Sequence, residues 1–171
     1  MLRTLTAALS MVMILAMTNA CTGETAEDPV FFLVRHAEKQ GGRDPSLTEA
    51  GTARAERLAA QLEKAGIEAV YATDTRRAQE TGAPLADALG LEIISYDPFD
   101  LGSFAADLKA AGQTALVVGH SNTTPNLAEK LGGESHGLIS EDDYDRLYCL
   151  EGDRTVLMQA GGMPLTGPGC P

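Results

Sequence analysis

Short, mostly apolar segments alternate with segments of helical spacing along most of the chain. The short segments predict strands at Val30–Val34, Ala69–Ala72, Glu92–Tyr96 and Ala115–Gly119. Apolar residues at helical spacing predict helices over Leu47–Ala65, Ala78–Leu89, Ser103–Ala111 and Thr124–Leu131. Strands that alternate with helices in this way predict an α/β fold, a three-layer α/β/α sandwich around a mostly parallel central sheet.

Local signals mark several ends of these elements. Ser46 and Glu49 match a capping box at the start of the first helix, and Gly66 is expected to end it. Residues 151–154 separate two further strand-like segments and predict a β-hairpin of Tyr144–Leu150 and Thr155–Ala160. Residues 161–171 are rich in glycine and proline, which predicts an irregular tail.

Cationic and imidazole side chains follow three of the predicted strands directly. Arg35 and His36 come after the first strand, Arg76 and Arg77 after the second, and His120 after the fourth. In open α/β sheets ligands bind at the carboxyl ends of parallel strands. We therefore expect these residues to meet in one anion-binding site.

These segments resemble the motifs of the histidine phosphatase superfamily, which has the phosphoglycerate-mutase-like fold. The resemblance covers residues 30–160 and rests on four motifs in order: Arg35-His36-Ala37-Glu38, Ser46-Leu47-Thr48-Glu49-Ala50-Gly51, Thr73-Asp74-Thr75-Arg76-Arg77-Ala78-Gln79-Glu80-Thr81 and Gly119-His120-Ser121-Asn122-Thr123. In the first motif, Ala37 takes the place of the more frequent Gly. The third motif aligns Arg77, rather than Arg76, with the arginine of the family. No insertion follows the third strand and the substrate loops are short, so the chain resembles a small, minimal member.

The resemblance implies a phosphatase that forms a phosphohistidine intermediate without a metal or other cofactor. His36 would be the nucleophile, and His120 would donate hydrogen bonds to the phosphoryl oxygens. Arg35 and Arg77 would clamp the phosphoryl group, because each guanidinium stays charged and presents a fork to two oxygens. The expected reaction is hydrolysis of a phosphomonoester with a small, anionic or phosphorylated substrate. A phosphomutase and an anion-binding module without turnover are the alternatives.

Other site residues are less well defined by the motifs. Ser121 and Asn122 follow His120 and are candidates for substrate binding, and so is Lys39, for which an ordinary surface position is the alternative. The leaving group needs a proton. The candidate donors are Glu38, Asp97 and Asp100, provided that burial raises the pKa of one of them.

The first twenty residues have the features of a secretory signal peptide. Arg3 precedes an apolar stretch from Leu5 to Met17, which is too short to span a bilayer. Residues 18–20 then precede Cys21, which indicates either a lipoprotein processing site, with Cys21 lipidated, or an ordinary signal peptidase site. We expect an exported protein of the periplasm or cell envelope, with residues 21–29 as a tether and a lipid on Cys21 as its one membrane contact.

Charge and cysteine content limit the partners. Removal of residues 1–20 takes away Arg3 and no acidic residue, so the net charge of −11 becomes −12. Such an acidic chain is a poor match for nucleic acid. If Cys21 is lipidated, Cys149 and Cys170 remain as an even pair, which in an exported protein suggests a disulfide; otherwise one thiol is left over.

Overall fold

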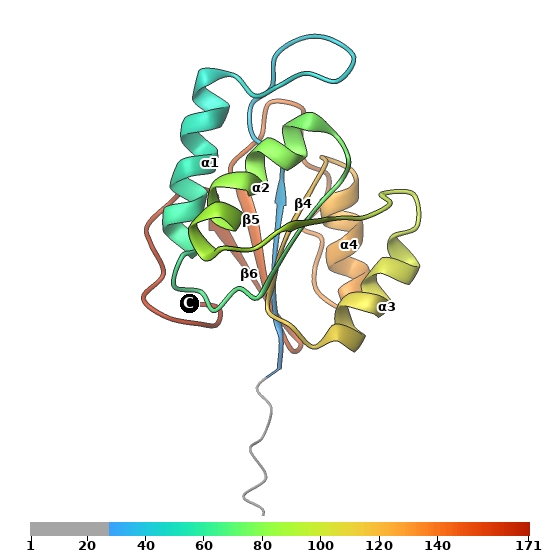
Figure 1. Cartoon of the computed structure of the whole chain (residues 1–171). Helices are drawn as coiled ribbons and strands as arrows, with labels where there is room; N and C mark the ends of the chain where they lie inside the picture. The colour runs from blue at the N-terminus through green and yellow to red at the C-terminus, as the bar shows by residue number, and fades with distance from the viewer. Residues whose placement is uncertain (1–27) are drawn as a thin grey trace, which may run out of the picture.

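The computed structural model describes residues 28–171, so the predicted signal peptide, Cys21 and nearly all of the predicted tether lie outside the described residues. Within that range the elements are β1 (Val30–Arg35), α1 (Glu49–Leu62), β2 (Ala69–Ala72), α2 (Arg76–Leu89), β3 (Ile93–Ser95), α3 (Leu101–Ala111), β4 (Ala115–Gly119), α4 (Thr123–Leu131), β5 (Arg146–Glu151) and β6 (Arg154–Gln159) (Figure 1). In the part of the chain described, no helix is long and apolar enough to cross a membrane.

The six strands form one sheet in the order β3-β2-β4-β1-β5-β6. The first four in that order are mutually parallel, and the hairpin β5–β6 is added antiparallel to β1. All six residues of β1 are buried, because β4 and β5 flank the strand and helices cover both faces. The predicted mostly parallel sheet is therefore confirmed.

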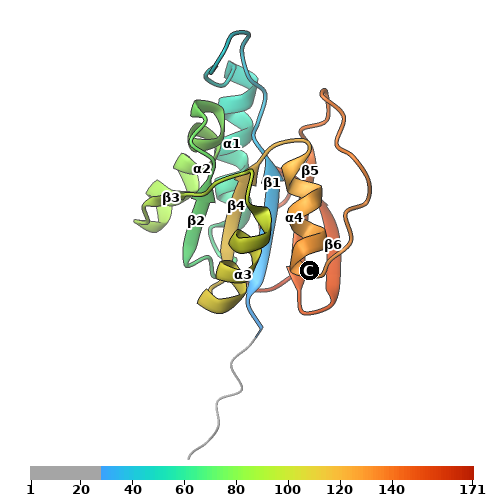
Figure 2. The ribbon, with the colours of Figure 1, turned by 90° about the vertical axis from the view of Figure 1, so that its right-hand side faces the viewer.

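Helices cover the two faces of the sheet in pairs (Figure 2). One core contains Phe32 and Val34 of β1 with apolar residues of α1 and α2, and the other contains Phe31 and Leu33 with those of α3 and α4. Alternate residues of one strand thus fill two cores, as the two-residue period of a strand requires. The three-layer α/β/α sandwich is confirmed.

The predicted capping box of the first helix is wrong. The N-cap of α1 is Thr48, whose hydroxyl accepts the Gly51 N–H at 3.1 Å. Ser46 is instead part of a loop that doubles back, and its carbonyl accepts the Gln40 N–H at 3.0 Å. A Cβ on Gly51 would overlap the Glu38 carbonyl oxygen, so only glycine lets α1 begin this close to the segment after β1.

The end of α1 also differs from the prediction. The helix ends at Leu62, and Gly66 (φ +75°) lies in the turn beyond it rather than at the C-cap. At α2, by contrast, the glycine that follows the helix, Gly90, is the C-cap, with a left-handed backbone whose N–H donates to carbonyls of the last turn. The difference arises because residues 63–65 already leave the helix before the glycine is reached.

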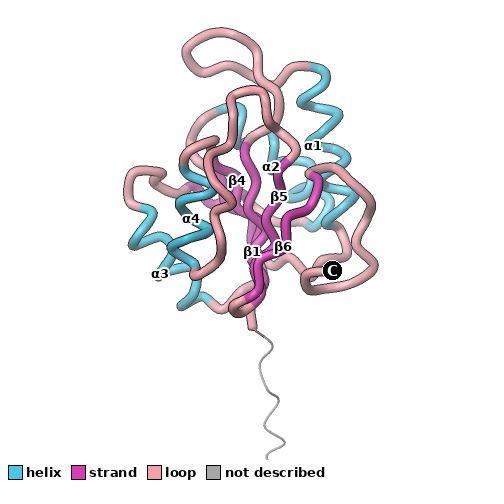
Figure 3. The backbone as a smooth tube through the Cα atoms, turned by 180° about the vertical axis from the view of Figure 1, so that it is seen from behind, coloured by secondary structure: helices cyan, strands magenta, loops and turns pink. Residues whose placement is uncertain are grey.

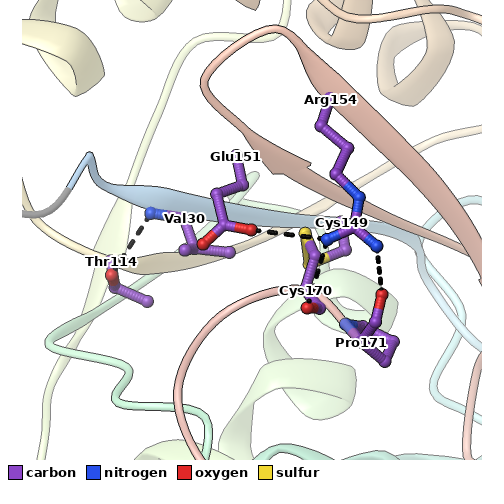
Figure 4. The surroundings of a disulfide bond; sticks show 7 residues. All are labelled: Val30, Thr114, Cys149, Glu151, Arg154, Cys170 and Pro171. Atoms are coloured by element: carbon purple, nitrogen blue, oxygen red, sulfur yellow. Dashed lines mark hydrogen bonds and ion pairs between the residues drawn. A yellow bond between two sulfur atoms is a disulfide. The ribbon is translucent and has the colours of Figure 1, made fainter.

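The tail after β6 has no strand or helix and returns along the α1 side of the sheet (Figure 3). The Leu165 N–H donates to the carbonyl of Gln61 at the end of α1, at 2.8 Å. A disulfide joins Cys170 in this tail to Cys149, which is fully buried in β5, with 5.7 Å between the two Cα atoms (Figure 4). The last residues are thereby held against the sheet.

Candidate active site

Three neighbouring parallel strands bring the expected residues together. β2, β4 and β1 are adjacent in the sheet, and their carboxyl ends lie at the top in Figure 1. Arg35 is the last residue of β1 and His36 follows it, whereas Arg77 lies in the first turn of α2 and His120 directly after β4. The rings of His36 and His120 are 5.4 Å apart between centroids, in an edge-to-face arrangement.

His36 is buried, with 3% of its surface exposed. Its Nδ1 lies 2.8 Å from the Ala37 carbonyl oxygen. A carbonyl only accepts, so Nδ1 carries the proton and the lone pair is on Nε2. Burial, together with the positive charge of Arg77, lowers the pKa of His36 from 6.5 to about 3. The ring is therefore neutral at physiological pH.

His120 is fixed by contacts on both sides of its ring. Arg77 Nη2 donates to Nδ1 at 3.5 Å, which leaves the proton on Nε2, and Nε2 donates to the Thr73 hydroxyl at 3.1 Å. Burial, followed by Arg77, lowers the pKa of His120 to about 4. The residue before His120 is Gly119, and a Cβ at that position would lie only 2.8 Å from the Thr123 hydroxyl oxygen. Glycine therefore leaves room for this hydroxyl, which accepts a hydrogen bond from the His120 backbone N–H.

Arg35 is held by the loop that precedes β5. Its Nη1 donates to the carbonyl oxygens of Ser140, Glu141 and Asp143 at 2.7, 2.9 and 3.1 Å, and its Nη2 donates to the Glu141 carboxylate at 3.1 Å. The guanidinium also lies over the Tyr144 ring, 4.3 Å from its centroid. Its Nε is buried and has no hydrogen-bond partner among the described residues.

Arg77, and not Arg76, faces the histidines. The Arg77 Nε is also buried without a partner in the part of the chain described, and its Nη1 lies 3.8 Å from the Asp44 carboxylate. Arg76 is exposed, and its backbone N–H donates to the same Asp44 carboxylate. The two site arginines therefore each direct an unused Nε–H into a buried environment, where an unpaired donor is costly.

An open cleft of about 740 Å³ lies beside Arg77. Thr73 and Arg77 line one part of it, and the loop after β3, which includes Phe99, lines another. Within residues 28–171 no group of three His, Cys, Asp or Glu side chains is arranged to hold a metal ion.

Comparison with known proteins agrees with this arrangement. The family model "Histidine phosphatase superfamily (branch 1)" matches residues 31–100, which include Arg35, His36 and Arg77. The match covers less than half of the 171-residue chain, and over that segment the chain is similar to the histidine phosphatase superfamily. It is 36% identical over 73 residues to "Phosphoserine phosphatase 1" of Hydrogenobacter thermophilus, a match that covers 38% of this chain and 35% of the relative. It is also 36% identical over 75 residues to "Probable phosphoglycerate mutase GpmB" of Yersinia enterocolitica, covering 39% and 34%.

The matched segment thus spans about a third of the length of either curated relative. Among solved structures, the protein histidine phosphatase SixA complexed with tungstate superimposes with a TM-score of 0.61 at 21% identity, covering 77% of this chain and 97% of that one. At this identity the likeness shows the phosphoglycerate-mutase-like fold of the superfamily.

None of the three predicted proton donors is a buried, unpaired carboxyl group. Glu38 accepts hydrogen bonds from Arg54, with Oε1 2.7 Å from Nη2, and this pairing lowers the pKa of Glu38. Asp100 is exposed and caps α3, and the hydrogen bonds from Ser103 lower its pKa. Asp97 is exposed and accepts the Phe99 N–H at 2.9 Å. The expectation that burial prepares Glu38 or Asp100 as an acid is wrong.

The remaining candidates lie at the edge of the site. The Ser121 hydroxyl donates to the Glu141 carboxylate at 3.1 Å, and Asn122 is exposed at the start of α4. Lys39 is half-buried, and its backbone forms an antiparallel bridge with Leu47. The structure does not bring Asn122 or Lys39 into contact with the histidines.

Two residues that touch the site, Thr73 and Glu141, were not predicted as site residues. Thr73 lies within a recognised motif, but no local signal indicated that its hydroxyl would contact His120. Glu141 begins an acidic run, residues 141–143. No helix begins there; the run is an exposed loop whose carbonyls and one carboxylate hold Arg35.

Proposed function

We propose that this protein is a metal-independent phosphomonoester hydrolase that acts through phosphohistidine at His36. The observation that carries the proposal is the pair of buried Nε–H groups of Arg35 and Arg77, which have no partner within residues 28–171 and lie beside two neutral histidines. Such donors require an acceptor, and a phosphoryl dianion supplies three equatorial oxygens. The phosphatase named among the relatives supports the same reaction class.

The four residues account for the first half of the reaction. Arg35 and Arg77 hold nonbridging oxygens and neutralise their charge, while His120 donates its Nε2–H after release from Thr73. The lone pair on His36 Nε2 attacks phosphorus, a P–N bond forms, and the P–O bond to the alcohol breaks. The departing alkoxide takes a proton from water or from a group at the cleft.

The second half returns the enzyme to its starting state. Water attacks phosphorus, the P–N bond breaks, and inorganic phosphate leaves with His36 neutral again. A low pKa is useful here, because an imidazole that resists protonation remains a nucleophile and departs readily from phosphorus. Two guanidinium groups and two imidazoles provide the charge stabilisation that a metal supplies in other phosphatases.

Replacement of His36 tests this proposal, and the chain offers a matched control. We expect His36→Ala to lose nearly all hydrolysis of a generic phosphomonoester, with or without chelator. His136→Ala should keep it, because His136 contacts Glu134 and Tyr148 rather than the site residues. Labelled substrate should leave an acid-labile label on the wild type. Full activity in His36→Ala would show that His36 is not the nucleophile.

An anion-binding module without turnover is the second candidate. Its support is that the Glu141 carboxylate already accepts a hydrogen bond from the Arg35 guanidinium and that hydrogen bonds lower the pKa of Glu38 and of Asp100. Binding of vanadate without hydrolysis of any ester in a broad screen would favour it. A phosphomutase is supported by the match to a relative carrying that name, and transfer of phosphate between two alcohols rather than to water would reveal it.

We also propose that the protein is exported and anchored by a lipid on Cys21. The signal-like residues 1–20 support export, and so does the Cys149–Cys170 disulfide, because such bonds persist in oxidising compartments. Mass spectrometry of the processed protein should find a lipidated Cys21, and the protein should partition into detergent. An unmodified terminus at Cys21 would instead indicate a soluble periplasmic protein.

A further inference from the structure

The cleft beside Arg77 is much larger than a phosphoryl group. Its volume of about 740 Å³ falls in the range of sites for whole small molecules, about 300–1,000 Å³. Arg77 and Thr73 lie on one wall, and the loop that follows β3 forms another. The space beside Arg77 is large enough to hold the rest of a substrate whose phosphoryl group lies at Arg77.

Phe99 presents an almost fully exposed ring to this space. It is 95% exposed, and single exposed apolar residues are ordinary on protein surfaces. Two further observations distinguish it: the residue lines the cleft that contains Arg77, and its backbone is fixed. The Asp97 carboxylate accepts the Phe99 N–H at 2.9 Å, and the Asp97 carbonyl accepts the Asp100 N–H at 3.3 Å. These bonds fix the backbone of Phe99 at the cleft, and its exposed ring offers a stacking face to a flat ligand group.

The other charges of the cleft oppose a second anionic group. Asp44, Asp74 and Asp97 line it, whereas Arg43 is the cation there besides Arg77. Arg77 is expected to bind the phosphoryl group, and Asp44 already lies beside it at 3.8 Å. A substrate with a carboxylate or a second phosphate would face these carboxylates, and like charges at short range are repulsive.

We propose that this cleft binds the alcohol portion of a phosphomonoester that is uncharged and carries a flat apolar group, with Phe99 as the specificity-determining residue. This inference rests on the proposed hydrolase function. It names the class of substrate, and it assigns a role to an exposed residue that takes no part in the chemistry.

A chemically matched series of esters tests the proposal. Ethyl, phenylethyl and carboxyethyl phosphate are all primary alkyl esters, so they differ chiefly in the group that reaches the cleft. We expect phenylethyl phosphate to have the highest kcat/KM and carboxyethyl phosphate the lowest. In Phe99→Ala the preference for phenylethyl over ethyl phosphate should fall about 3- to 10-fold, the size of an aromatic stacking contact.

Met163→Ala is the control, since Met163 is another large exposed apolar residue, 86% exposed, that lies outside the cleft. It should leave the preference unchanged. An unchanged preference in Phe99→Ala, an equal fall in Met163→Ala, or carboxyethyl phosphate as the best ester would each overturn the proposal.

A binding experiment separates this inference from the hydrolase function. Phenylethyl and ethyl phosphonate contain no bond that the enzyme hydrolyses, so their dissociation constants report recognition alone. Tighter binding of phenylethyl phosphonate that is lost in Phe99→Ala, in a protein without turnover, would uphold the cleft and refute the hydrolase. Turnover without that difference would uphold the hydrolase and refute the role of Phe99.

Discussion

Replacing Arg77 with lysine separates the shape of its guanidinium from its charge. In the structure Arg77 reaches His120 through Nη2 and keeps a buried Nε–H without a partner. Lysine keeps the positive charge, but its single ammonium does not occupy both positions. Arg76 is the matched control, because it is adjacent, carries the same charge and is exposed.

The expected loss follows from the contacts that disappear. A hydrogen bond to a charged group is worth about 1.5–3 kcal/mol, and a fork that binds two phosphoryl oxygens loses at least one of them in lysine. A loss of roughly 2–4 kcal/mol from the transition state corresponds to about 30- to 1,000-fold in rate. Arg76→Lys should change the rate by less than about twofold, because exposed charges contribute little.

The assay is kcat/KM for one generic phosphomonoester, measured for wild type, Arg77→Lys and Arg76→Lys, with vanadate binding in parallel. Circular dichroism of the variants reports whether the fold is intact. If Arg76→Lys is as damaging as Arg77→Lys, the assignment of Arg77 as the phosphate ligand is wrong. If Arg77→Lys retains wild-type kcat/KM and vanadate affinity, the second arm of the clamp does not exist.

Three further predictions concern stability and binding. The pKa of His36 in the folded protein is lowered to about 3, so below pH 6.5 the unfolded chain binds a proton that the folded protein does not. The free energy of unfolding should therefore fall by roughly 2 kcal/mol between pH 8 and pH 5 because of this residue. Chemical denaturation of His36→Gln should show a smaller fall over the same pH range. Glu141→Gln should tighten phosphate binding about two- to fivefold, because it removes an ion pair with Arg35 worth about 0.5–1 kcal/mol that competes with the phosphate. Asp142→Asn makes the same change of charge at the next residue and should leave the affinity unchanged. Calorimetry measures both affinities. Replacing both Cys149 and Cys170 with serine should lower the free energy of unfolding by about 3 kcal/mol, the loop-closure entropy expected for a sequence separation of 21 residues. In this double variant, reductant should no longer change the denaturation midpoint.

Local sequence was sufficient to predict the layers and the location of the site. The burial of β1 on both faces follows from its unbroken apolar run, and a cation and an imidazole at its end have to emerge at the edge of the sheet. The same reasoning placed His120 after β4. Helix ends were less predictable, because whether Ser46 or Thr48 caps α1 depends on a loop that bonds back to Gln40.

Tertiary structure decided which of these residues carry charge and which are free to bind an anion. Arg35 is held by carbonyls of residues more than a hundred positions away, and Glu38 is kept ionised by Arg54 from the following helix. Ionisation and hydrogen bonding depend on the whole surroundings of a side chain, whereas strand and helix patterns depend on near neighbours in sequence. The sequence therefore determined that two arginines and two histidines meet at one edge of the sheet. Only the fold determined that both histidines are neutral, that both Nε–H groups are unpaired, and that Phe99 faces the cleft.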